Sequence, residues 1–204
     1  MIYLYSGTPG SGKSLHQASD IYWWLHNNKP CICNFEINTD KIKTKKLGEF
    51  YYISNDILRP ELLIKYSQIY FKDHKFKEGA IRLYIDECQL LFNAREWQQT
   101  GRKEWLSFFT QHRKYGYDIY LIAQFDRMID RQIRSLIEYE IIHRKVKNFG
   151  KWGMFFNLVA GGNLFVAVKV WYPMKERISS EYFKGNKRYF ELYNTWNTFT
   201  TEIT

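Results

Sequence analysis

Residues 7–14 read GTPGSGKS and follow directly on the apolar run IYLYS at residues 2–6. The spacing G-x-x-x-x-G-K-S is that of the Walker A loop, which requires a strand before it and a helix after it. Its glycines let successive backbone N–H groups surround a phosphate chain. In such a loop the lysine contacts the β- and γ-phosphates, and the serine hydroxyl ligates Mg²⁺. The sequence therefore predicts a nucleotide-binding loop formed by Thr8, Pro9, Gly10, Ser11, Gly12, Lys13, Ser14 and Leu15.

A second motif, LYIDE at residues 83–87, supplies the acids that such a site needs. Its apolar half predicts a strand with Asp86 at the carboxyl end, where the carboxylate can hold Mg²⁺ directly or through water. Glu87 can orient and activate the attacking water. Adjacent Asp and Glu resemble the additional-strand class of P-loop ATPases, in which a further strand lies between the loop strand and the acidic strand. That strand is expected at YDIYLIAQ, residues 117–124, and places the polar Gln124 near the γ-phosphate.

Hydrophobic periodicity predicts the surrounding elements. A helix is expected over residues 13–26, a second over 57–71 capped by Asp56, and a third over 102–115. Strands alternate with these helices through residue 137, which predicts an α/β core with a parallel sheet and helices on both faces.

The remainder is expected to be richer in strands. Residues 139–172 predict antiparallel strands added at one edge, with Gly161-Gly162-Asn163 as a hairpin turn. We therefore expect a single domain over residues 1–204, with a core at 1–137 and a β-rich extension at 138–204.

Composition limits the partners. The chain has 204 residues, of which 45% are hydrophobic and 25% charged, as in soluble globular domains. Its net charge of +9 favours an anionic partner, either nucleic acid or a negative membrane leaflet. The aromatic content of 19% is explained by core filling or by an interaction surface. A membrane-spanning helix needs about 20 consecutive apolar residues, and the sequence contains no such run.

Cysteines and arginines are further candidates for ligands or catalysts. The spacing of the cysteines at positions 31, 33 and 88 does not match a zinc site. We therefore expect them to be buried, reduced thiols in a reducing compartment. Arg127, Arg131 and Arg134 lie at i, i+4 and i+7, typical either of a solvated helix face or of contacts with phosphates. Arg113, Arg127 and Arg134 are the candidates for an arginine finger on the γ-phosphate of a neighbouring subunit. For Arg113, a favourable charge at a helix C-terminus is the alternative.

The order of the motifs resembles the Zot family, named after zonular occludens toxin, which includes the gene I assembly ATPases of filamentous phages. The segments that carry the resemblance are the early loop, NFEI, IDE, HRKYGYDIYLIAQ, IDRQIRSLIE and LYNT, between residues 2 and 195. The resemblance implies an FtsK–HerA-like ATPase domain on the cytoplasmic face of the bacterial inner membrane. It also implies hydrolysis of ATP with Mg²⁺ to extrude single-stranded phage DNA as coat proteins are added.

Carried onto this sequence, the resemblance assigns Gly12, Lys13 and Ser14 to the phosphate loop and Gln124 to the strand end. Asp86 and Glu87 become the acidic pair. The implied partners are a homo-oligomeric ring, phage coat and assembly proteins, single-stranded DNA, and the inner membrane through a segment absent from this chain. The chain is then either a cytoplasmic fragment or a relative without an anchor.

Two other functions stay open at this point. A small-molecule kinase also carries an early phosphate loop, although the Asp86-Glu87 pair suits water activation better. A switch or scaffold module would hold nucleotide without turnover and bind assembly proteins on its aromatic surface.

Overall fold

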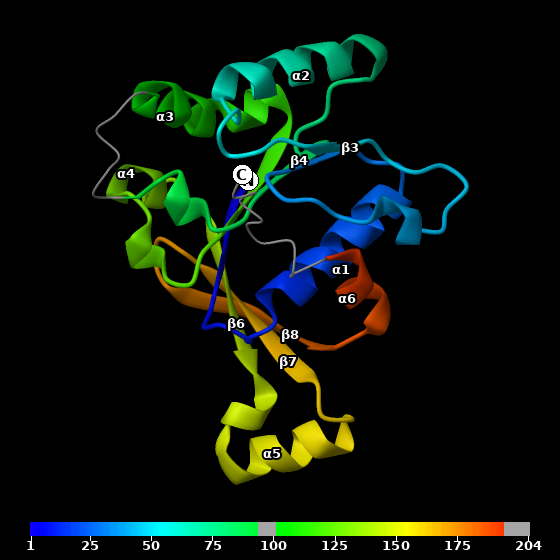
Figure 1. Ribbon diagram of the computed structural model, residues 1–204. Coiled ribbons are helices and arrows are strands. Elements are labelled where there is room, and N and C mark those ends of the chain that lie inside the picture. Colours follow the sequence, from blue (N-terminus) through cyan, green and yellow to red (C-terminus); the bar gives the residue numbers. More distant parts are fainter. Residues whose placement is uncertain (94–100, 194–204) are drawn as a thin grey trace, which may run out of the picture.

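An eight-stranded sheet organises the computed structural model, which describes residues 1–93 and 101–193 (Figure 1). The strand order is β3-β2-β4-β5-β1-β6-β7-β8. The strands are β1 Ile2–Ser6, β2 Cys31–Cys33, β3 Phe50–Tyr52, β4 Ile81–Ile85, β5 Tyr117–Ile122, β6 Tyr139–Lys145, β7 Leu164–Trp171 and β8 Glu176–Lys184.

The position of β5 fixes the class of the fold. It pairs in parallel with β1 on one side and with β4 on the other, so it separates the loop strand from the acidic strand. This is the additional strand that the sequence predicted. Because the carboxyl ends of parallel strands lie at one edge of the sheet, the residues that follow β1, β4 and β5 meet at that edge.

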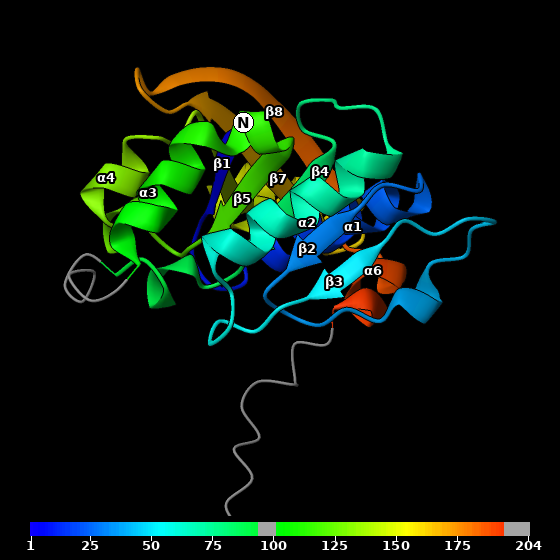
Figure 2. The same ribbon diagram turned by 90° about the horizontal axis from the view of Figure 1, so that it is seen from above.

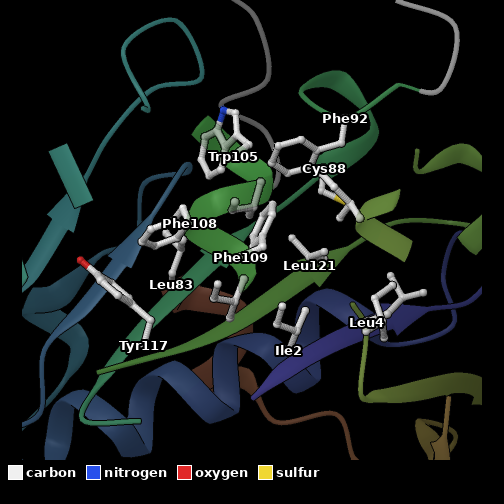
Figure 3. Close-up of a cluster of buried hydrophobic side chains, with 14 of the residues drawn as sticks. Ile2, Leu4, Leu83, Cys88, Phe92, Trp105, Phe108, Phe109, Tyr117 and Leu121 are labelled. Carbon is white, nitrogen blue, oxygen red and sulfur yellow. The ribbon is translucent and has the colours of Figure 1, made fainter. Parts of the chain in front are cut away.

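Helices cover both faces of the sheet, as predicted (Figure 2). The face of α1 and α6 packs against Tyr5 and Tyr84, whereas Leu4 and Leu83 point to the face of α2 and α3. Figure 3 shows the second face, where Trp105, Phe108 and Phe109 of α3 cover the apolar side chains of the central strands. The helices are α1 Lys13–His26, α2 Pro60–Asp73, α3 Arg102–Gln111, α4 Arg131–Arg134, α5 Gly150–Val159 and α6 Lys187–Leu192.

Most predicted helix bounds need small corrections. The predicted helix at 13–26 is confirmed. α2 starts at Pro60, not at residue 57, and Arg59 takes the N-cap place expected for Asp56. Proline favours the first helical position because its missing N–H would have no partner there. α3 ends at Gln111, and a 3₁₀ turn continues the chain to Tyr115.

The C-terminal part differs more. The prediction of antiparallel strands from residue 139 holds for only one side of β6, which pairs antiparallel with β7 but in parallel with β1 over Tyr139–Ile142. Residues 150–159 form α5, so Gly161-Gly162-Asn163 follows a helix and is not a hairpin turn. The antiparallel addition itself is confirmed, since β7 pairs with β6 and β8 pairs with β7. No helix within residues 1–93 and 101–193 is both long and apolar enough to cross a bilayer.

Candidate nucleotide-binding site

The loop at residues 7–14 joins β1 to α1 in a conformation that depends on glycine. Gly10 has φ 72° and Gly12 has φ 98°, in the left-handed region that other residues rarely adopt. Gly12 meets a second restriction, because a Cβ atom there would lie 2.7 Å from a ring carbon of Phe165. A strand of the C-terminal part, β7, therefore packs directly against the phosphate loop.

The residues of the loop fit a phosphate chain. The first turn of α1 contains no acidic residue and no side chain caps it, so its N-terminal backbone N–H groups face the loop with their positive dipole. The buried Ser11 hydroxyl has no hydrogen-bond partner within the described part of the chain. Thr8, Pro9 and Gly10 form an exposed rim, while Leu15 is buried.

Lys13 spans the loop, and its ammonium lies within electrostatic reach of the acids that follow β4. Its Nζ donates to the carbonyl oxygen of Gly7 at 2.6 Å and to that of Thr8 at 3.3 Å. Partial burial lowers the pKa of Lys13, while the negative charges of Asp86 and Glu87 act to raise it. The structure thus brings the three ionisable residues predicted for the site to the same edge of the sheet.

Asn34, which follows β2, holds the peptide of Asp86 in place. Its side-chain amide accepts a hydrogen bond from the Asp86 N–H at 2.7 Å and donates to the Asp86 carbonyl at 2.8 Å. The same amide donates to Asn55 at 2.8 Å. Sequence reasoning assigned no role to Asn34, although it begins the NFEI segment that resembles the family.

The Asp86 carboxylate is bound on both oxygens. It accepts from the Glu87 N–H at 2.8 Å and from the hydroxyl of Tyr193 at 2.5 Å. Burial raises the pKa of Asp86, and these two hydrogen bonds act in the opposite direction. Tyr193 follows α6 and belongs to the LYNT segment, whose last two residues lie outside the described residues. Its role was also missed from sequence.

Glu87 occupies a strained position. Its φ of 46° and ψ of 44° are left-handed, which costs a non-glycine residue about 1–2 kcal/mol. The side chain is exposed and accepts a hydrogen bond from the amide of Gln89. Such strain is commonly retained at functional sites. The turn aims the carboxylate outward from the end of β4, where water has access to it.

Gln124 lies beside the loop, just after β5. Its carbonyl accepts a hydrogen bond from the Gly7 N–H at 3.2 Å. A cavity of about 470 Å³ opens next to this contact, lined by Gly7, Thr8, Gln124, Asp126, Glu140, Lys145 and Phe149 among others. The predicted strand-end position is therefore adjacent to the phosphate loop.

The three candidate arginines belong to three different turns or helices. Arg113 pairs with Glu138 at 2.6 Å, and Glu138 also accepts from the Ile2 N–H, so this pair is at the amino edge of the sheet, opposite the loop. Arg127 is exposed in the turn after Gln124, and Arg134 ends α4. The predicted helical stripe of arginines is wrong, because Arg127 lies in a separate 3₁₀ turn, Ile129 is extended, and α4 has a single turn.

Two histidines lie beside the loop, the buried His143 of β6 and the partly buried His16 of α1. His143 Nε2 lies 2.8 Å from His16 Nδ1, and His143 Nδ1 lies 3.2 Å from the Ser6 carbonyl. Burial, together with the neighbouring His16, lowers the pKa of His143 from 6.5 to about 3. A Cβ atom on Gly7 would lie 2.6 Å from the His143 carbonyl, so β6 contacts the start of the loop closely.

This depressed pKa gives a testable pH dependence. Between pH 6.5 and about 3 the unfolded chain binds a proton at His143 that the folded chain does not, so this contribution to stability is lost as pH falls. Urea unfolding of the wild type should lose about 2–3 kcal/mol more than His143→Asn does between pH 7 and pH 4.5. Equal losses for the two proteins would contradict this account of His143.

The fold and the site together define an additional-strand P-loop NTPase. The chain belongs to the Zot family, since the model of the zonular occludens toxin (Zot) family matches residues 1–199. Among individual relatives, the Gene 1 protein of Escherichia phage If1 is 26% identical over 148 residues, 70% of this chain and 40% of that protein. The Gene 1 protein of Enterobacteria phage M13 is 33% identical over 61 residues, 30% of this chain and 18% of that protein.

Solved structures share the fold at low identity. The N-terminal domain of zonular occludens toxin from Neisseria meningitidis aligns over 95% of this chain and 98% of its own, with TM-score 0.54 and 17% identity. The genome packaging NTPase B204 of Sulfolobus turreted icosahedral virus 2, in complex with AMPPCP, covers 91% of this chain and 97% of its own, with TM-score 0.55 and 16% identity.

Proposed function

We propose that this chain is the ATPase domain of a motor that assembles filamentous phage and extrudes single-stranded DNA through the host inner membrane. The observation that carries the proposal is the meeting of Lys13, Asp86 and Glu87 at one edge of an additional-strand sheet. Membership of the Zot family, with phage Gene 1 proteins among the relatives, supports the biological setting. The chain spans no more than 40% of the two relatives named above, so their whole activity is proposed for it only in part.

The loop binds the phosphates of ATP. Backbone N–H groups at the start of α1 bind the anion, and Lys13 exchanges its bonds to loop carbonyls for contacts with the β- and γ-phosphates. Ser14 and Asp86 would hold Mg²⁺, which would neutralise phosphate charge. Tyr193 and Asn34 orient Asp86 for this role.

Glu87 acts as the general base. Its exposed carboxylate takes a proton from water while the water oxygen bonds to the γ-phosphorus and the bond to the β–γ bridging oxygen breaks. Gln124, beside Gly7, contacts the γ-phosphate or the attacking water. Both Glu87 and Gln124 are catalytic residues in this proposal, since each contacts the reacting groups.

The site is completed by a second subunit in a ring. Arg113, Arg127 and Arg134 remain the candidates for an arginine supplied in trans, and Arg113 lies too far from its own loop to act in cis. We further propose phage coat and assembly proteins and single-stranded DNA as partners. The domain works on the cytoplasmic face of the inner membrane, where a segment outside residues 1–204 anchors it.

ATP hydrolysis measured against protein concentration tests this proposal. The rate per subunit is expected to rise with concentration, because dilute monomers lack the neighbour's arginine, and Lys13→Ala is expected to abolish turnover at every concentration. A rate per subunit independent of concentration would contradict the interface. Turnover that depends on an added phosphate acceptor would indicate a kinase. Binding of Mg-ATP without turnover, even in the assembled protein with its anchor, would indicate a switch.

A further inference from the structure

The helix α5 exposes its apolar side chains to solvent and turns its small and polar residues toward the rest of the chain. Its buried residues are Gly153 and Asn157, a small and a polar one, while its large apolar side chains point to solvent. The exposed fraction is 75% for Trp152 and Leu158 and 72% for Val159. Met154, Phe155 and Phe156 are each more than half exposed as well. Figure 1 shows α5 projecting beyond the end of β6, away from the helices that cover the sheet.

The inward side of α5 makes close contacts that fix the orientation of the helix. A Cβ atom at Gly153 would lie 2.3 Å from the Val146 carbonyl, which fixes that side of the helix against the chain. The Asn157 amide donates to the Gly162 carbonyl at 3.1 Å and accepts from the Leu164 N–H at 3.0 Å. These contacts keep the apolar face of α5 exposed to solvent. Soluble proteins rarely expose contiguous apolar surface of this kind unless it binds something.

The charge around α5 limits what covers it. No aspartate or glutamate occurs between Glu140 and Glu176, whereas Arg144, Lys145, Lys147 and Lys151 lie at or just before the helix. Lys147 and Lys151 are exposed. A partner must therefore be apolar where it meets the aromatic side chains and anionic around them. A second α5 fits poorly against this surface, because it would bring another Lys147 and Lys151, and no acidic side chain, to the same place.

A bilayer with anionic headgroups has both properties. Interfacial helices place Trp, Phe and Leu at the boundary of headgroups and acyl chains and keep lysines near the headgroup phosphates. Ten residues are too few to span a bilayer, but an interfacial helix only has to lie along its surface. We propose that α5 is a membrane-contacting helix that inserts Trp152, Phe155 and Leu158 into an anionic lipid surface.

The proposal is independent of nucleotide hydrolysis, because α5 contributes no residue assigned to catalysis. It does imply that the lipid surface lies near the nucleotide site. Lys145 and Phe149, which lead into α5, line the same cavity as Gly7 and Thr8 of the phosphate loop.

Flotation of this chain with lipid vesicles tests the proposal. The wild type should float with vesicles of equal parts phosphatidylethanolamine and phosphatidylglycerol and bind weakly to phosphatidylcholine vesicles. The double variant Phe155→Ser, Leu158→Ser should not float. Its matched control is Leu62→Ser, Ile69→Ser, which removes two exposed apolar side chains from α2 and should bind as the wild type does. The variant Lys147→Gln, Lys151→Gln should lower the affinity for anionic vesicles by roughly 30-fold.

Circular dichroism and the thermal midpoint establish that each variant is folded, as expected for exposed positions. Failure of the wild type to float with anionic vesicles, or equal flotation of the α5 variant, would overturn the proposal. Sedimentation gives the remaining outcome. The wild type could form a dimer that the α5 variant does not form, with neither protein binding vesicles. In that case a second copy covers α5, and the lipid proposal is wrong.

Discussion

Replacing Glu87 by glutamine is expected to lower ATP turnover by about 10²–10⁴-fold, the usual contribution of a general base. The substitution removes the proton-accepting carboxylate but keeps the shape of the side chain and the left-handed backbone that aims it away from β4. Binding of a non-hydrolysable ATP analogue should remain close to that of the wild type, since the Lys13 ammonium and the loop are unchanged. Turnover and binding are measured at a protein concentration at which the wild type is active.

The matched control for this prediction is Glu61→Gln, which makes the same change at an exposed position on α2. Its turnover should equal that of the wild type. If Glu87→Gln retains turnover within a few-fold, the carboxylate that activates water lies elsewhere. If it loses nucleotide binding as well, Glu87 has a structural role in the site instead of a chemical one.

The substitution Gly12→Ala is expected to lose nucleotide binding and to destabilise the fold by about 3–5 kcal/mol. The new methyl group must adopt a φ of 98° and also lies 2.7 Å from the ring of Phe165, so strain and a steric clash add. Because the loop presents its N–H groups in one conformation, a shift of Gly12 disrupts the phosphate site at the same time. Urea unfolding and nucleotide titration measure the two effects.

Gly10→Ala separates the two causes. Gly10 has φ 72°, but nothing lies within 4 Å of the position a Cβ atom would take, so only the backbone strain of about 1–2 kcal/mol applies. The double variant Gly12→Ala, Phe165→Ala should recover part of the difference in stability between the two glycine variants. Equal destabilisation by Gly10→Ala and Gly12→Ala would show that the contact with β7 does not restrict the loop.

The parts of the site that lie within one short segment of the chain could be predicted from the sequence. The loop needs its glycines, lysine and serine in one short segment, and Asp86 and Glu87 follow directly on an apolar strand. Asn34 could not be found this way, because it bonds to Asp86 across 52 positions and only the pairing of β2 with β4 brings them together. The contact of Tyr193 with Asp86 spans 107 positions and depends on α6 packing near α1.

Two errors in the predicted fold have physical causes. Alternation of apolar residues marks a strand but does not give its direction, so β6 could not be assigned as parallel from its own sequence. The second error concerns α5, which lacks the apolar face toward the core that marks an ordinary helix. Its apolar residues, followed by Gly161 and Gly162, instead resembled a buried strand that ends in a hairpin turn.

The hydrogen bond between Tyr193 and Asp86 has one more consequence. It ties the residue that follows α6 to a proposed metal ligand, so a displacement of α6 reaches the edge of the sheet that carries Asp86. Pulling α6 away from α1 would break the bond, and the carboxylate would lose its fixed direction. In the proposed motor, a load that displaces α6 would therefore slow hydrolysis by releasing the Asp86 carboxylate.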